Sequence, residues 1–234
     1  MSSTLVATAT PEAQNFRPAS RVQQALTARI EGKALLWLAA RAPEKVSPDH
    51  LTALGFAAQF LAGVSYALAR WNKYALLLAT FFIALNWLGD SLDGTLARFR
   101  QRLRPRYGFY VDHMSDTFGA VFLMCGLAGS GYLHWQVAIA MLVAFLVLSI
   151  ESYLTTYTLG RFNMSHGLFG PTEIRVLLSI GNVALIFHPY AHLFGHRFLL
   201  FDVGGVVAVA GMSSMAGFAC VRHTASLFAE ERLS

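Results

Sequence analysis

The chain has 234 residues, of which 55% are hydrophobic and only 13% are charged, with a mean hydropathy of +0.48. A soluble domain of this size carries about 25% charged residues, so the composition indicates a membrane protein. Its two cysteines exclude a disulfide framework or a cysteine-based zinc site. The net charge of +5 is attributed to membrane edges that face anionic headgroups, and nucleic acid is not expected as a partner.

The N-terminal region is predicted to be a tail followed by an amphipathic helix. Residues 1–15 are small and polar, and no apolar stretch long enough for a secretory signal occurs in residues 1–33. From Ser20 to Arg41, apolar residues recur at helical spacing with basic residues between them, which predicts a helix lying in the membrane interface. A solvated helix with a weak apolar stripe is the alternative.

Six apolar segments are predicted to cross the bilayer, because a spanning helix needs about 20 residues. They are Leu51–Ala69, Tyr74–Gly89, Thr117–Leu133, Trp135–Ile150, Val176–Phe187 and Val203–Val221. The predicted fold is therefore all-α and polytopic, with six transmembrane helices and the N-terminal interfacial helix. We assign residues 1–45 to the tail and interfacial helix, 46–225 to one membrane domain, and 226–234 to a C-terminal tail.

The basic residues predict the orientation of these spans. With six crossings, all of the 18 Lys and Arg residues except Arg70, Lys73 and Arg197 fall on the side that holds both termini. Positive residues mark the cytoplasmic side of membrane proteins, so both termini and the 97–107 connection are expected there.

Four aspartates interrupt the apolar pattern near that side. Asp90 and Asp93 share one helix face, and Asp112 and Asp116 share a face at the start of the next span. The short connection between the two helices predicts that all four carboxylates point into one volume. Such charges need a proton or a cation to compensate them, and oxygen ligands favour Mg²⁺, Mn²⁺ or Ca²⁺ over zinc. Two such ions would suit phosphoryl transfer.

The strings Asp90-Ser-Leu-Asp93-Gly94-Thr-Leu-Ala97-Arg98 and Gly108-Phe-Tyr-Val-Asp112-His-Met-Ser-Asp116 resemble the signature of the CDP-alcohol phosphotransferase (phosphatidyltransferase) family. All eight fixed residue types are present in order, but the connection between the strings is one residue longer than usual. The resemblance implies a homodimeric membrane transferase that uses Mg²⁺ or Mn²⁺, with two ions expected. It would move a phospho-alcohol group from a CDP-alcohol to an alcohol or lipid acceptor and release CMP.

The resemblance also implies a role for each matching residue. Metal ligands would be Asp90, Asp93, Asp112 and Asp116, and Asp116 is the usual candidate for the base that deprotonates the acceptor. The nucleotide site would comprise Asp90, Gly94, Ala97, Arg98, Gly108 and Asp112, with Arg98 countering phosphate charge.

His113 is a second candidate base, because Asp112-His113-Met114-Ser115-Asp116 is similar to the choline and ethanolamine phosphotransferase version of the signature. The alternative is a hydrogen-bonded histidine at a helix start. Glu173, in Gly170-Pro171-Thr172-Glu173, resembles the same branch and is a candidate for the acceptor site, or an ordinary helix-start acid. Glu151 and Arg175 are further acceptor-site candidates, Glu151 either lining a cavity or pairing with an arginine.

Several functions remain open at this point. The two strings similar to the choline and ethanolamine branch favour a CDP-choline or CDP-ethanolamine type donor with a lipid acceptor. The alternative is CDP-diacylglycerol with serine, glycerol phosphate or inositol phosphate. A phosphorylated acceptor would need a basic pocket, for which Arg161 and Arg175 are available. A carboxylate-based cation or proton transporter is the alternative from a different class. The apolar outer half-spans and the interleaved glycines disfavour it, and the intact signature disfavours an inactive scaffold.

Overall fold

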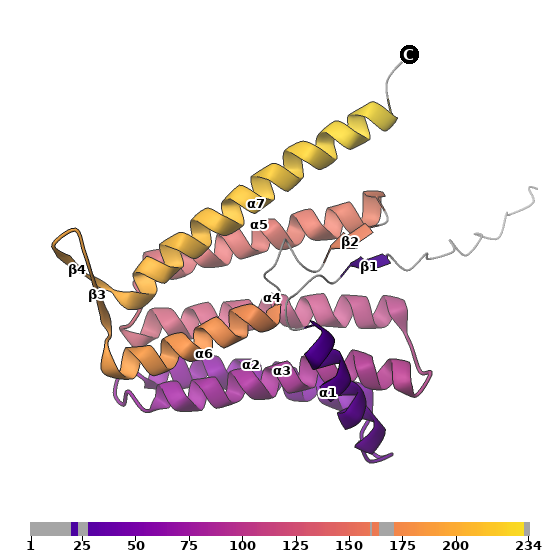
Figure 1. The fold of residues 1–234 in the computed structure, drawn as a ribbon, viewed down its shortest axis with the longest axis horizontal. Coiled ribbons are helices and arrows are strands. Elements are labelled where there is room, and N and C mark those ends of the chain that lie inside the picture. The colour runs from indigo at the N-terminus through magenta and orange to yellow at the C-terminus, as the bar shows by residue number, and fades with distance from the viewer. Residues whose placement is uncertain (1–19, 23–27, 160, 164–170, 232–234) are drawn as a thin grey trace, which may run out of the picture.

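The computed structural model describes residues 20–22, 28–159, 161–163 and 171–231, and this part of the chain is mainly helical (Figure 1). The all-α prediction is therefore confirmed. The helices in chain order are α1 (Ala28–Arg41), α2 (Pro48–Leu68), α3 (Ala75–Phe99), α4 (Pro105–Ser130), α5 (Trp135–Leu159), α6 (Pro171–Phe187) and α7 (Leu200–Glu230).

Four of these helices are long and apolar enough to cross a membrane, namely α2, α3, α5 and α7. This supports a multi-pass integral membrane protein. The other two predicted spans coincide with α4 and α6, but α6 has only 17 residues and the first half of α4 is polar. The number of six spans therefore stays a prediction.

The N-terminal helix is shorter than predicted. Ser20–Val22 forms strand β1, which pairs in parallel with β2 (Arg161–Asn163), so the predicted helix start at Ser20 is wrong. Pairing with a distant segment overrides the local helical periodicity here. α1 crosses the bundle at a steep angle (Figure 1) and packs against α3. It buries Leu35 and Ala39 against that bundle while Trp37 stays exposed.

A β-hairpin joins α6 to α7, made of β3 (Tyr190–Leu193) and β4 (His196–Leu199). Its two turn residues, Phe194 and Gly195, both have positive φ angles of 51° and 78°. Two-residue hairpin turns require this conformation, which glycine adopts without strain. The hairpin lies at the end of the bundle opposite α1 (Figure 1).

α2 is the helix on which α3 and α4 pack, and glycines make both contacts close. A Cβ added at Gly89 of α3 would lie 2.6 Å from the Leu51 carbonyl oxygen and 2.7 Å from the Gly55 nitrogen. Two turns further along α2, Gly63 and Gly126 bring the backbones of α2 and α4 into direct contact. Backbones approach this closely only where no side chain intervenes. Thus α2 holds the ends of α3 and α4 that carry the aspartates.

Candidate functional site

The four aspartates line one narrow, open cleft between α2, α3 and α4. Its other lining residues are Thr52, Gly55, Phe56 and Gln59 from α2, Asn86 from α3 and Ser115 from α4. The convergence predicted from their spacing is therefore present in the structure.

The physical reason for the convergence is different from the predicted one. The short 100–104 connection was expected to make α3 and α4 neighbours, whereas each of them packs mainly on α2. Side chains of α2 then reach across the cleft. Thr52 Oγ1 donates a hydrogen bond to Asp93 Oδ2 at 2.6 Å, and Gln59 Oε1 accepts one from Asn86 Nδ2 at 3.1 Å.

These α2 residues were missed in the sequence, although a signal exists. Thr52 and Gln59 are polar and seven residues apart, on one face of an otherwise apolar helix. Asn86 precedes Asp90 by one helical turn in the same way on α3. Polar residues at membrane depth that share a face with acidic ones indicate a site.

Arg175 reaches Asp90 from α6. Its Nη2 lies 2.6 Å from Asp90 Oδ2, and the two side chains are 16% and 25% exposed. This ion pair places one predicted acceptor-site residue beside the cleft. It also compensates one of the four carboxylates, as low-dielectric surroundings require.

The donor set of the cleft fits a hard divalent cation, because every side-chain group offered is an oxygen donor or an amide. In their present conformations Asp90 is turned to Arg175, and Asp93 to Thr52 and the Gly94 amide. Accordingly, no three acidic, histidine or cysteine side chains of the described residues are grouped at ligating spacing. The chemistry of the site suits Mg²⁺ or Mn²⁺. Ligation by Asp90 needs its carboxylate to turn from Arg175, whereas a carboxylate oxygen that accepts one hydrogen bond, as in Asp93, can still ligate a cation through its second lone pair.

The predicted nucleotide residues other than the aspartates lie outside the lining of the cleft. Ala97 is buried, with 9% exposure. Arg98 is exposed and donates to Thr95 Oγ1 at 3.1 Å. No described atom lies within 4 Å of a Cβ added at Gly108. Packing within the described chain therefore does not require a glycine there.

His113 is held in an aromatic cluster next to the cleft. Its Nδ1 lies 2.7 Å from the Phe109 carbonyl oxygen, so this nitrogen donates the hydrogen bond. The imidazole stacks on the Phe109 ring at 4.0 Å and meets the Tyr153 ring edge-on at 4.8 Å. Its neighbours Asp112 and Asp116 line the cleft, and His113 does not. Tyr153 was missed because its partners lie on α4, distant in sequence.

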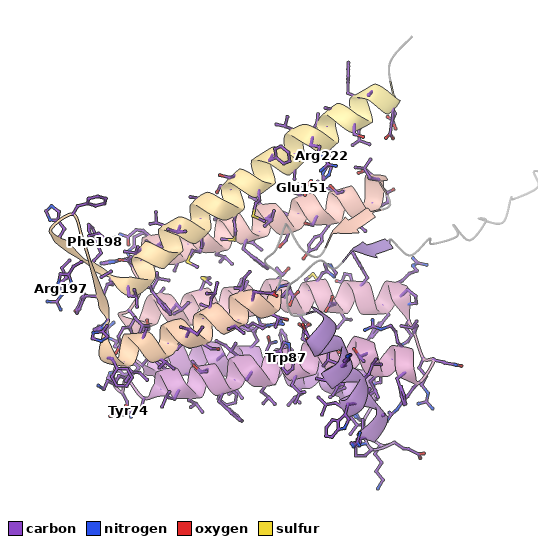
Figure 2. The ribbon with its side chains drawn as sticks, in the orientation of Figure 1. Tyr74, Trp87, Glu151, Arg197, Phe198 and Arg222 are labelled. Carbon is purple, nitrogen blue, oxygen red and sulfur yellow. The ribbon has the colours of Figure 1, made fainter. Side chains whose placement is uncertain are left out.

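Glu151 takes part in a separate contact between α5 and α7. Its Oε1 lies 2.5 Å from His223 Nδ1 and accepts from Thr155 Oγ1 at 2.8 Å. Figure 2 shows Glu151 on the side of α5 that faces α7. The suggested arginine partner is thus a histidine, and Glu151 does not line the cleft. Glu173 lies in the first turn of α6, half-buried.

Comparison with known proteins gives relatives that share parts of the chain. An archaetidylinositol phosphate synthase of Pyrococcus horikoshii is 30% identical over 120 residues, which cover 51% of this chain and 57% of that protein. An uncharacterised protein of Aquifex aeolicus is 33% identical over 147 residues, covering 60% of this chain and 69% of that protein.

The fold has a counterpart among solved structures. The crystal structure of Mycobacterium tuberculosis phosphatidylinositol phosphate synthase with CDP-DAG bound has a TM-score of 0.55 and 17% sequence identity. The match covers 88% of this chain and 99% of that one. The sequence model of the CDP-alcohol phosphatidyltransferases matches residues 45–215, which include α2 to α6 and the four aspartates of the cleft. The chain therefore belongs to the CDP-alcohol phosphatidyltransferase family.

Proposed function

We propose that this chain transfers a phospho-alcohol group from a CDP-alcohol to an acceptor hydroxyl, releasing CMP, in phospholipid synthesis. The observation that carries the proposal is the cleft between α2, α3 and α4, which is lined by all four aspartates of the family signature. No comparable observation favours the cation-transporter alternative.

In this proposal the four aspartates hold Mg²⁺ or Mn²⁺, in one or two sites. When bound, the metal neutralises the diphosphate and stabilises charge that develops on its oxygens. Asp90, Asp112, Gly94, Ala97, Arg98 and Gly108 form the nucleotide side, where the Arg98 guanidinium counters phosphate charge. The open space at Gly108 supports a ligand approaching the backbone there.

The reaction is a substitution at phosphorus. The acceptor oxygen bonds to the phosphorus that bears the donor alcohol, the bond to the CMP phosphate breaks, and CMP leaves with the bonding electrons. Asp116 takes the acceptor proton, because it lines the cleft and His113 does not. His113 instead keeps Phe109 and Tyr153 in place beside Asp112.

For the substrates, we propose a CDP-diacylglycerol-type donor and a small polar acceptor that carries a phosphate. Arg175, with its guanidinium beside the cleft, supplies a positive charge for such an acceptor, and Glu173 lies in the same turn region of α6. The similarity to an archaetidylinositol phosphate synthase supports this choice over a CDP-aminoalcohol donor.

The test uses purified protein with Mn²⁺ or Mg²⁺, CDP-diacylglycerol, CDP-choline or CDP-ethanolamine, and a panel of acceptors. We expect CMP to be released from CDP-diacylglycerol with a phosphorylated polyol, and no release by Asp93→Asn. CMP release from CDP-choline with diacylglycerol would instead support the aminoalcohol branch. If no donor yields CMP and the protein conducts cations in liposomes, the transferase proposal is wrong.

We further propose that the protein forms a homodimer with its cleft on the cytoplasmic side. Gly204, Gly211 and Gly217 of α7 have no described atom within 4 Å of an added Cβ, which leaves room for a second helix. Light scattering of the detergent-solubilised protein tests the oligomeric state, and a monomeric mass would contradict it.

A further inference from the structure

Glu31 of α1 joins three helices through one carboxylate. Its Oε1 accepts hydrogen bonds from Trp87 Nε1 at 2.9 Å and Ser91 Oγ at 3.2 Å, both on α3. Thr172 Oγ1, at the start of α6, lies 3.2 Å from each carboxylate oxygen. Figure 2 labels Trp87 on the stretch of α3 beside α1. Glu31 lies before residue 45, where the match to the family begins.

The Glu31 contact requires a fixed arrangement of its three neutral hydrogen-bond donors. The carboxylate is half-buried, and Trp87, Ser91 and Thr172 carry no charge. Withdrawing a charged carboxylate from water is unfavourable unless hydrogen bonds replace its hydration. The three donors do so only when α1, α3 and α6 hold one relative position, so the contact fixes that position.

The position fixed in this way is next to the cleft. Ser91 directly follows Asp90, and Thr172 precedes Arg175 by about one helical turn on α6. The Glu31 contact and the Asp90–Arg175 ion pair are therefore neighbouring links between the same two helices. A displacement of the first turn of α6 would move the Arg175 guanidinium relative to Asp90.

We propose that Glu31 is a positioning residue that holds the first turn of α6 against α3, and so sets Arg175 at the acceptor side of the cleft. The part concerning the acceptor rests on the proposed function. An N-terminal segment outside the matched region would thus determine the acceptor geometry of the family's site.

The proposal distinguishes two substitutions at one position. Glu31→Gln keeps an oxygen in the Oε1 position, which accepts the hydrogen bonds of all three donors. Glu31→Ala removes that oxygen. For Glu31→Ala we expect the acceptor KM to rise on the order of tenfold to a hundredfold, since small misplacements of positioning groups have effects of this size. The donor KM should change less than threefold, and Glu31→Gln should restore the acceptor KM to near wild type.

A matched control is available in Asp202→Ala. Asp202 also links two elements, accepting from the His134 backbone amide at 2.9 Å and contacting its ring, but at the hairpin end of the bundle (Figure 1). If the loss of any carboxylate that links two parts of the fold raised the acceptor KM, Glu31→Ala and Asp202→Ala would show the same rise. The proposal requires that Asp202→Ala leaves the acceptor KM unchanged.

A second readout does not depend on catalysis. Hydrogen–deuterium exchange of the ligand-free protein in nanodiscs should show faster exchange in the first turns of α6 for Glu31→Ala, and not for Glu31→Gln or Asp202→Ala. Unchanged exchange in α6 for Glu31→Ala would overturn the proposal, as would an equal rise of both KM values. If no CDP-alcohol is a substrate, the exchange experiment still decides whether Glu31 positions α6, so the two failures are distinguishable.

Discussion

Thr52 and Asp93 show how a single hydroxyl on α2 orients a carboxylate of the cleft. The Thr52 hydroxyl donates to Asp93 at 2.6 Å, while the second oxygen of Asp93 accepts from the Gly94 amide. Hydrogen bonds of this kind fix the rotamer of a metal-binding carboxylate. In the proposed metal site, Thr52 would thereby orient a ligand without being a ligand itself.

We expect Thr52→Val to weaken Mn²⁺ binding by about 10- to 100-fold, because loss of a partner that orients a ligand has effects of this order. Thr52→Ser keeps the hydroxyl and should stay within a few-fold of wild type by the same reasoning. Titration of free Mn²⁺ by electron paramagnetic resonance measures the affinity. Equal Mn²⁺ affinities for the valine variant and wild type would contradict this role.

The two candidate bases should differ in their response to substitution. Asp116→Asn keeps the size of a cleft-lining side chain but removes its basicity, so we expect kcat to fall by about 10²- to 10⁴-fold. His113→Phe keeps a ring to stack on Phe109 and should lower kcat by less than about tenfold. Removal of the base itself would lower kcat by more than this. A reversed order of the two effects, measured by CMP release, would identify His113 as the base.

Among the site residues, the aspartates could be predicted and several of their partners could not. Asp90, Asp93, Asp112 and Asp116 stand in two short strings, so their spacing alone indicates shared faces. Glu31 and Tyr153 contact the site region through residues on other helices, 56 positions away in the case of Trp87. Local spacing contains no information about such contacts.

At the scale of the helices, close packing at glycines positions the cleft. Replacing Gly89 with alanine would place a methyl group against the backbone of Leu51 and Gly55, which are part of α2. The helices must then separate, and this separation would move Asp90 and Asp93 away from Thr52.

We expect Gly89→Ala to lower the free energy of unfolding by about 1–3 kcal/mol, the usual cost of overpacking. Gly129→Ala, on α4, is the matched control, since its added Cβ would meet only the Ala67 Cβ at 3.8 Å and alanine favours a helix over glycine. Thermal unfolding in detergent compares the two. Equal melting temperatures would show that the α2–α3 crossing tolerates a methyl group.

Helix positions followed from hydropathy where the helix is apolar throughout, and less well elsewhere. The span predicted at Leu51–Ala69 corresponds to α2 at Pro48–Leu68, whereas α3 continues ten residues beyond the predicted end at Gly89. Those last residues mix the charged Asp90, Asp93 and Arg98 with buried apolar residues such as Leu96, so an apolar window ends before the helix does. Strands β1 to β4 were missed because a strand is defined by its partner.

At the scale of the whole molecule, the two ends of the bundle should lie on opposite sides of the membrane. The basic connection between α3 and α4 is at one end, and the hairpin with exposed Phe194 is at the other (Figure 1). In cysteine-free protein, obtained by replacing Cys125 and Cys220, single cysteines can report each end.

We expect a membrane-impermeant maleimide to label Phe194→Cys in intact cells, and Arg102→Cys only after permeabilisation. Both positions are exposed, so access to reagent is limited by the membrane and not by burial. Labelling of Arg102→Cys in intact cells would show that the orientation is opposite to the one that the basic residues predict.

The ion pair between Asp90 and Arg175 also bears on how the chain is made. The two residues are 85 positions apart, so a ribosome completes α3, α4 and α5 before it reaches the arginine of α6. During this interval, Asp90 is present at the membrane without that partner. A nascent chain that ends before α6 should therefore hold its aspartates near water, and packing of α6 against α3 is the step that closes the charge pair.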